Sequence, residues 1–218
     1  MILRRTLLAA TAASALPIAA VAAALPVPPT GRIGFQILRK GDVIGTHELT
    51  FSGPPDSPVV RVAIDMLVKF GPVPVFRYQH RATETWKSGQ FVSLESKTNH
   101  DGTPHFVTAR REQAGIVVEG SKTQRYTAPD GTLPTTYWNK AMLGSRVINS
   151  EDGRLFNVTH AALAEEAVPL ASGATTRARH YNVSGELDLD LWYDDFQQWA
   201  HLMFTKDGNT IIYEKLAA

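Results

Sequence analysis

The sequence has no cysteine among its 218 residues. Disulfide bonds are therefore excluded as a source of stability, and so is lipid attachment through an N-terminal cysteine. A strong excess of charge is also missing, because 22 Lys and Arg residues stand against 21 Asp and Glu residues. Nucleic-acid binding depends on clustered basic side chains that neutralise several phosphates, so we predict no nucleic-acid partner.

Motifs of well-known catalytic and cofactor sites are absent as well. The chain has no Gly-x-Ser-x-Gly elbow, no phosphate-binding loop and no dinucleotide fingerprint. None of its seven histidines shows the helix spacing of a zinc site, and His100 and His105 flank an expected turn. We predict no metal and no cofactor. The catalytic residues, if any, stay unassigned, and a non-enzymatic role is favoured.

A long, strongly apolar run is also lacking, and the nearest approach to one stands at the N-terminus. Arg4 and Arg5 precede an uncharged, alanine-rich stretch over residues 6–24. This stretch is too weakly apolar for a stable membrane span. Its basic start and its small residues at 22–24 are typical of an export signal. We predict a signal peptide at residues 1–24, Sec or twin-arginine export, and a periplasmic or secreted mature chain without a stable membrane span.

Removal of the signal would leave about 194 residues with 20 basic and 21 acidic side chains, which is enough for one domain with one core. Residues 25–31 are rich in proline and are expected to be an extended lead-in. Residues 32–218 are expected to form a single β-barrel-like domain. No feature of the sequence sets the oligomeric state.

From residue 32 onward, apolar residues alternate with polar ones. This period-two pattern predicts half-buried strands, and the Asp-Gly and Ser-Gly pairs between them predict hairpin turns. Residues 135–143 depart from the pattern and approximate helical spacing, which predicts a short helix there. The predicted strands lie near residues 32–38, 43–51, 58–70, 74–87, 90–99, 105–113, 116–120, 154–160, 175–184, 187–193, 199–206 and 209–216.

Ten to twelve antiparallel strands in fewer than 200 residues predict a sheet that curves, since a flat sheet of that width would leave one apolar face wet. Closure or near-closure would also remove exposed strand edges. The predicted fold class is all-β and mainly antiparallel. We expect a strongly curved meander sheet that forms a half-barrel or incomplete β-barrel, with one short helix near residues 135–143.

Short motifs recur in a particular order along the chain. They are Ile44-Gly45-Thr46-His47, Tyr78-Gln79-His80, Glu84-Thr85-Trp86, Leu94-Glu95-Ser96-Lys97-Thr98-Asn99, Asp101-Gly102, Leu191-Trp192-Tyr193-Asp194 and Ile211-Ile212-Tyr213-Glu214. Together they resemble the exported bacterial family called domain of unknown function 6134. The C-terminal pattern also resembles the domain of unknown function 3108 family, which implies an envelope-associated β half-barrel. Neither resemblance implies catalytic residues.

The strand predicted at residues 74–87 carries the best candidate site. Buried ionisable groups need a partner or a wet cavity. One interpretation is a ligand pocket whose polar groups are His80 and Glu84. The other is a packed core, in which Glu84 pairs with an arginine such as Arg110 and His80 bonds a backbone carbonyl. The candidate pocket wall consists of Phe76, Tyr78, His80, Glu84 and Trp86.

Three functions fit these features. The leading hypothesis is an exported periplasmic protein that binds a lipid-like or other apolar small molecule in a β-barrel-type cavity. The second is an enzyme of the same fold that uses His80 and Glu84 as acid and base. The third is a structural or interaction protein of the cell envelope with a packed interior and no ligand. An interior cavity of a few hundred Å³ would favour the first two.

Overall fold

The computed structural model describes residues 24–144 and 146–217, which form β-strands almost throughout. The predicted signal peptide lies outside the described residues except for its last one, Ala24. Within the described ranges, no helix has the length and apolar character that crossing a membrane requires. The strands are β1 (Arg32–Arg39), β2 (Asp42–Ser52), β3 (Val59–Phe70), β4 (Val73–Lys87), β5 (Gln90–His100), β6 (Thr103–Glu112), β7 (Gly115–Gly120), β8 (Thr123–Ala128), β9 (Leu133–Pro134), β10 (Arg146–Ile148), β11 (Leu155–Pro169), β12 (Thr175–Gly185), β13 (Leu189–Tyr193), β14 (Trp199–Lys206) and β15 (Asn209–Lys215).

The fifteen strands form one sheet. Its order is β8, β7, β6, β5, β4, β3, β2, β1, β15, β14, β13, β12, β11, β10, β9. Strands β1 to β8 follow one another as hairpins, and β1 also pairs with β15, so the sheet continues through the second half of the chain. Every named pair is antiparallel except β9 with β10. The predicted all-β, mainly antiparallel fold class is confirmed.

The prediction of a strongly curved half-barrel needs correction, because the sheet is neither closed nor strongly curled. Its end strands β8 and β9 do not pair with each other. A loop packs at this end instead. The backbone N–H of Lys122 donates to the carbonyl of Asp152 at 3.1 Å, and a Cβ at Gly120 would lie 2.7 Å from the Cα of Gly153. Loop contacts therefore replace the strand pairing that barrel closure would need.

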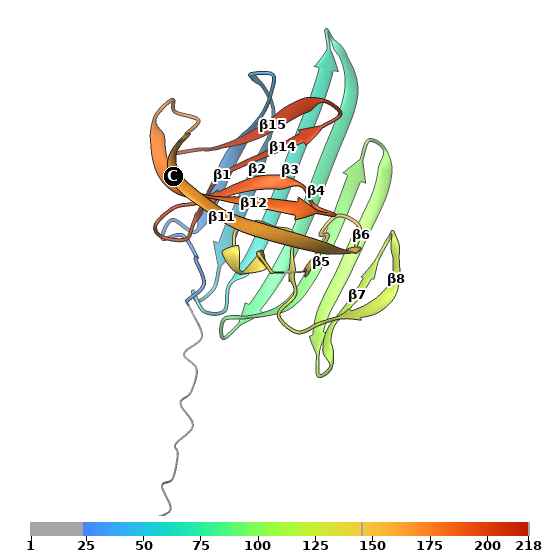
Figure 1. The fold of residues 1–218 in the computed structure, drawn as a ribbon. Coiled ribbons are helices and arrows are strands. Elements are labelled where there is room, and N and C mark those ends of the chain that lie inside the picture. Colours follow the sequence, from blue (N-terminus) through green and yellow to red (C-terminus); the bar gives the residue numbers. More distant parts are fainter. Residues whose placement is uncertain (1–23, 145, 218) are drawn as a thin grey trace, which may run out of the picture.

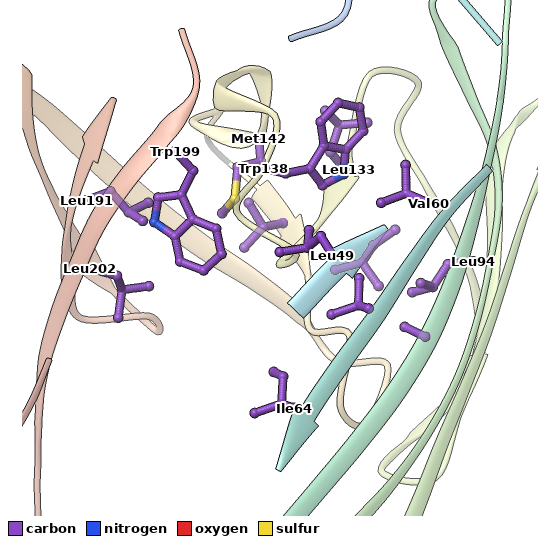
Figure 2. Close-up of a cluster of buried hydrophobic side chains, with 14 of the residues drawn as sticks. Leu49, Val60, Ile64, Leu94, Leu133, Trp138, Met142, Leu191, Trp199 and Leu202 are labelled. Carbon is purple, nitrogen blue, oxygen red and sulfur yellow. The ribbon is translucent and has the colours of Figure 1, made fainter. Parts of the chain in front are cut away.

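Side chains from both parts of the sheet meet in the larger of two apolar clusters. In Figure 1 the later strands, from β11 to β15, pass in front of the earlier ones. Figure 2 shows Trp138, from the segment between β9 and β10, lying between side chains of the two parts. The labelled neighbours are Leu49, Val60 and Leu94 on β2, β3 and β5, and Leu191, Trp199 and Leu202 on β13 and β14. The inserted segment thus completes the core.

The predicted helix near residues 135–143 is only one 3-10 turn, η1 (Lys140–Met142). The reason is local, because Tyr137 has a φ of 66° and this left-handed conformation interrupts an α-helix. The turn begins at Asn139, whose side-chain oxygen accepts a hydrogen bond from the N–H of Ala141 at 3.0 Å. Apolar residues in this segment are buried by tertiary packing rather than by a helical face.

Candidate functional site

A cavity of about 620 Å³ lies between the early and late strands of the sheet. This volume is within the range of small-molecule sites. Strands β2, β3 and β4 supply one part of its wall, and β14 and β15 supply another. The wall is mainly apolar. Its aliphatic, methionine and phenylalanine side chains are Ile44, Val62, Ile64, Met66, Val68, Val75, Phe76, Phe156, Leu187, Leu202, Phe204 and Ile211.

Strand β4 has the inward face that the alternation predicts, because its even-numbered residues from 76 to 86 are buried or half-buried. The structure divides this face into two parts. Phe76, Tyr78 and His80 line the cavity. Glu84 and Trp86 do not line it, and both are buried further along the strand. Four residues of strand separate His80 from Glu84, about 13 Å, so the two side chains do not share the cavity.

His80 belongs to a row of side chains that crosses the sheet. The strand register places His47 opposite Ile64, Ile64 opposite His80, and His80 opposite Thr98. Directly opposed residues point to the same face of a sheet, so the row brings two imidazoles to the cavity wall. Nδ1 of His80 lies 2.8 Å from the Thr98 hydroxyl. A cross-strand hydroxyl therefore takes the place of the backbone carbonyl that the packed-core interpretation named.

His47 is the least satisfied polar side chain of the cavity wall. It is 1% exposed, and neither of its ring nitrogens has a hydrogen-bond partner. Its ring lies edge-on to Trp199 at 5.1 Å and to Tyr213 at 5.8 Å between centroids. Burial, followed by repulsion from His80, lowers the pKa of His47 to about 3. Burial, with a smaller effect of Arg81, lowers the pKa of His80 to about 4.

Both histidines are therefore neutral at pH 7, well above these pKa values. A neutral imidazole has one N–H donor and one lone-pair acceptor. One nitrogen of His80 is engaged with Thr98, whereas both nitrogens of His47 are free of hydrogen bonds. His47 is thus a neutral polar ring at the cavity wall whose two buried nitrogens have no hydrogen-bond partner in the described chain.

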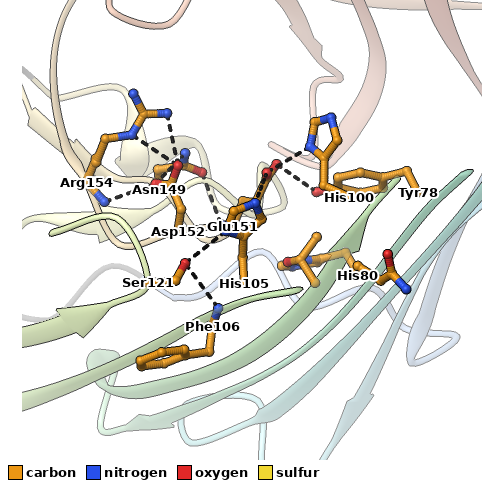
Figure 3. A network of polar contacts seen from close by, with 12 residues as sticks. Tyr78, His80, His100, His105, Phe106, Ser121, Asn149, Glu151, Asp152 and Arg154 are labelled. Atoms are coloured by element: carbon orange, nitrogen blue, oxygen red, sulfur yellow. Dashed lines mark hydrogen bonds and ion pairs between the residues drawn. The ribbon is translucent and has the colours of Figure 1, made fainter. Parts of the chain in front are cut away.

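A second polar feature of the cavity centres on Glu151 (Figure 3). Its Oε1 lies 2.9 Å from Nδ1 of His100, and its Oε2 accepts a hydrogen bond from the Tyr78 hydroxyl at 3.3 Å. Nε2 of His105 is 3.9 Å from the same carboxylate, and its Nδ1 lies 3.0 Å from the hydroxyl of Ser121. Burial, followed by the charge of Glu151, raises the pKa of Tyr78 well above its ordinary value. Tyr78 therefore remains a donor.

Glu151 is held in place by the loop at residues 149–154. The side-chain oxygen of Asn149 accepts a hydrogen bond from the N–H of Glu151 at 3.0 Å. Asp152 accepts from the Asn149 amide at 2.9 Å and from Nε of Arg154 at 3.0 Å. The carbonyl oxygen of Ser150 accepts a hydrogen bond from the hydroxyl of Ser96 on β5 at 2.6 Å. These contacts fix the loop to the sheet, so the carboxylate reaches the cavity wall in a defined position.

Glu84 occupies a different environment, below the cavity wall. Its Oε2 accepts hydrogen bonds from Nε1 of Trp86 at 2.8 Å and from Nε1 of Trp138 at 2.9 Å, while Oε1 has no partner. Burial raises the pKa of Glu84. The partner that the packed-core interpretation named was wrong, because Arg110 is exposed and pairs with Glu95 at 2.9 Å. Two indoles and the side chain of Thr136, but no arginine, act on the carboxyl group.

Most polar residues of the cavity wall were missed from the sequence, among them His47, His100 and Glu151. His47 had a usable signal, since it alternates with Leu49 and Phe51 on the inward face of its strand. The sequence around Glu151 had no such signal, because turn residues do not show where the loop that contains them packs. Among the residues that the structure describes, no group of three His, Asp or Glu side chains is placed to hold a metal ion.

These features define an all-β protein whose single, open, mainly antiparallel sheet borders a largely apolar cavity. The chain belongs to the family Domain of unknown function (DUF6134), which matches residues 35–215, so the resemblance inferred from the motifs is confirmed. Among solved structures it is similar to one described as "Crystal Structure of Beta-barrel-like Protein of Domain of Unknown Function DUF1849 from Brucella abortus". The two are 12% identical with a TM-score of 0.59, over 84% of this chain and 94% of that chain. This likeness concerns the fold alone. No curated protein matches the chain.

Proposed function

We propose that this protein is exported to the periplasm or secreted, and that it binds a lipid-like or other apolar small molecule in the cavity. The observation that carries the proposal is the cavity itself, about 620 Å³ in volume, with mainly apolar walls and polar groups at defined places on them. Small-molecule sites have this composition. In this proposal the ligand lies between the early and late strands of the open sheet, and the alanine-rich N-terminal segment directs export.

The cavity favours binding over a purely structural role. Space inside a core destabilises a protein because the side chains around it lose contacts. A solely structural domain would therefore be more stable if side chains filled a cavity of this size. The alternative of an enzyme with His80 and Glu84 as acid and base receives less support, since Glu84 does not line the cavity and accepts both of its hydrogen bonds from tryptophan indoles.

The purified mature chain should bind the apolar fluorescent probe N-phenyl-1-naphthylamine, with saturation at a single site. Met66 and Leu67 provide a matched pair of variants, because Met66 lines the cavity and Leu67 points to the other face of β3. Met66→Trp should fill the space and weaken probe binding, whereas Leu67→Trp should leave it unchanged. Fluorescence titration measures both.

Two results would contradict the proposal. One is equal probe binding by the Met66→Trp and Leu67→Trp variants, which would place the probe elsewhere. The other is absence of probe binding by the wild-type chain, together with native mass spectra that show no co-purified molecule. Thermal unfolding of each variant provides the control for folding.

The free nitrogens of His47 indicate what kind of ligand fits. A buried polar group without a partner costs about 1–3 kcal/mol. Both nitrogens are buried, so the ring would turn toward the cavity to meet a hydroxyl or carbonyl oxygen of the bound molecule. We therefore propose that the apolar ligand carries a neutral hydrogen-bonding group that reaches His47.

His47→Phe should weaken binding of a long-chain alcohol by about fivefold to tenfold, which corresponds to one hydrogen bond. The substitution keeps an aromatic ring among Trp199 and Tyr213 but removes both nitrogens. Displacement of the naphthylamine probe by dodecanol and by dodecane measures the effect. The affinity for dodecane should not change. An equal loss for both compounds would show that the ring matters for packing only.

A further inference from the structure

Exposed apolar side chains are concentrated at one end of the sheet. The β1–β2, β3–β4 and β14–β15 turns all lie at this end, at the top of Figure 1, because β1 pairs with β2 and β15 and β3 pairs with β2. Four of the seven large apolar side chains that are exposed in the described part of the chain belong to it. They are Val43 at 59%, Phe70 at 82%, Val73 at 57% and Val75 at 53% exposure.

The β3–β4 hairpin extends beyond its neighbours. Its last pairing with β2 is at Met66, and its outermost pairing with β5 is at Tyr78. Residues 67–76 therefore pair only within the hairpin, which projects furthest at the top of Figure 1. An isolated two-stranded hairpin is marginally stable in water. Its apolar tip, with Phe70 and Val73, has no covering element from the described chain.

Basic side chains outnumber acidic ones at this tip and in the two turns named below. The segments 39–43, 68–76 and 206–209 make up the tip and the two turns beside it, and they carry four basic residues against two acidic ones. The chain as a whole is nearly neutral, so this excess is local. The basic residues are Arg39, Lys40, Lys69 and Lys206, and the acidic residues are Asp42 and Asp207.

The mouth of the cavity opens at the same end. Three of the residues that line the cavity are exposed, namely Val75, Lys206 and Asp207. They belong to the β3–β4 hairpin and to the β14–β15 hairpin and its turn. The buried lining residues, such as His47 and His80, lie deeper between the strands. Any surface that covers the apolar tip would therefore also face the cavity mouth.

We propose that this end of the molecule docks on an anionic membrane surface, with Phe70 and Val73 inserted among the lipid headgroups. Interfacial binding combines buried apolar area with attraction between basic side chains and anionic lipids, and this tip offers both. A narrow projecting hairpin suits insertion between headgroups better than it suits the broad interface of a stable protein complex. Docking goes beyond the proposed ligand binding, because it requires no molecule in the cavity.

The test is sedimentation of the mature chain with vesicles of phosphatidylcholine and phosphatidylglycerol, compared with vesicles of phosphatidylcholine alone. The wild-type chain should sediment with the anionic vesicles and dissociate as salt is raised. The double variant Phe70→Ser/Val73→Ser should lower the partition coefficient at least about tenfold, because two apolar side chains no longer leave water. Lys40→Gln and Lys69→Gln should each lower it about fivefold.

Phe196→Ser is the matched control. Phe196 is also 82% exposed, but it precedes the start of β14, whereas Lys206 ends that strand. The eight residues of β14 span about 24 Å, so the two positions lie at opposite ends of the sheet. Phe196→Ser should leave vesicle binding unchanged. The substituted positions are exposed, so all variants should keep the wild-type unfolding midpoint.

Several outcomes would overturn the proposal. The proposal is wrong if the wild-type chain sediments with neither kind of vesicle. It is also wrong if Phe196→Ser lowers the partition coefficient as much as the double variant does. Equal binding to neutral and anionic vesicles would contradict the role of charge. A dimer that forms with rising concentration, and that the double variant abolishes, would show that a second copy of the chain covers the tip instead.

Discussion

Trp86→Ala should lower the free energy of unfolding by about 3–5 kcal/mol, because the substitution removes a large ring from a tightly packed site. Trp86 is 4% exposed. Its ring packs edge-on against Phe91 and Trp138, with centroids 5.7 Å and 5.3 Å away. Its indole N–H donates to Glu84 at 2.8 Å. Strands and aromatic rings surround the site, so the space left by alanine cannot collapse fully.

Equilibrium urea denaturation of the wild-type chain and the variant measures this loss. Phe76→Ala provides a matched control on the same face of the same strand, since Phe76 is half-buried at the cavity mouth and its loss should cost appreciably less than that of Trp86. A loss below about 0.5 kcal/mol for Trp86→Ala is typical of surface positions. That result would mean that the ring is not part of the packed core.

The strands could be predicted because their pairing is local. In β3, Val62 and Ile64 are buried while Arg61 is exposed, which is the alternation that the sequence shows. Each hairpin from β1 to β6 joins strands that are neighbours along the chain. Periodicity and turn residues together therefore predict both strands of each hairpin. The inward face of β4 followed from the same alternation. A one-residue slip would have turned Trp86 to solvent.

Other elements could not be predicted, because long-range contacts decide them. Strand β11 continues to Pro169, although residues 159–167 are exposed throughout and show no alternation in burial. Strands β9 and β10 have two and three residues, too few for a periodic pattern. Glu151 reaches the cavity through a loop that side-chain hydrogen bonds hold against β5. The local sequence shows neither where this carboxylate lies nor how the segment around Trp138 packs.

The family motifs have physical explanations in the structure. A Cβ at Gly45 would lie 2.0 Å from the carbonyl oxygen of Asp65, so only glycine allows the backbones of β2 and β3 to approach there. His47, two residues further on, Tyr78 and Tyr213 all line the cavity. Residues that are far apart in sequence and that carried the resemblance therefore come together around one space. This convergence agrees with a shared role of the cavity, which the probe titration addresses directly.

Glu84→Leu should destabilise the fold more than Glu84→Gln, although leucine is the more apolar residue. Two indole N–H groups donate to the same carboxyl oxygen, from Trp86 at 2.8 Å and from Trp138 at 2.9 Å. Leucine would leave both donors buried without an acceptor, at about 1–3 kcal/mol each. Glutamine keeps an oxygen acceptor, so we expect its loss to stay below about 1 kcal/mol. Urea denaturation at pH 7 compares the two variants.

The pH dependence of the Glu84→Gln variant tests the ionisation of this buried group. Burial raises the pKa of Glu84 above its ordinary value of 4.5, so from about pH 4.5 up to the raised pKa the folded chain binds more protons here than the unfolded chain. The stability that this carboxyl contributes is present below pH 4.5 and falls as the pH rises through that window. Glutamine does not titrate, while His47 and His80 titrate in both proteins and cancel in the difference. The unfolding free energy of the variant minus that of the wild type should therefore rise above pH 4.5. A difference that stays flat with pH would show that Glu84 ionises in the folded chain as it does in water, and that its carboxyl is not buried beneath the two indoles.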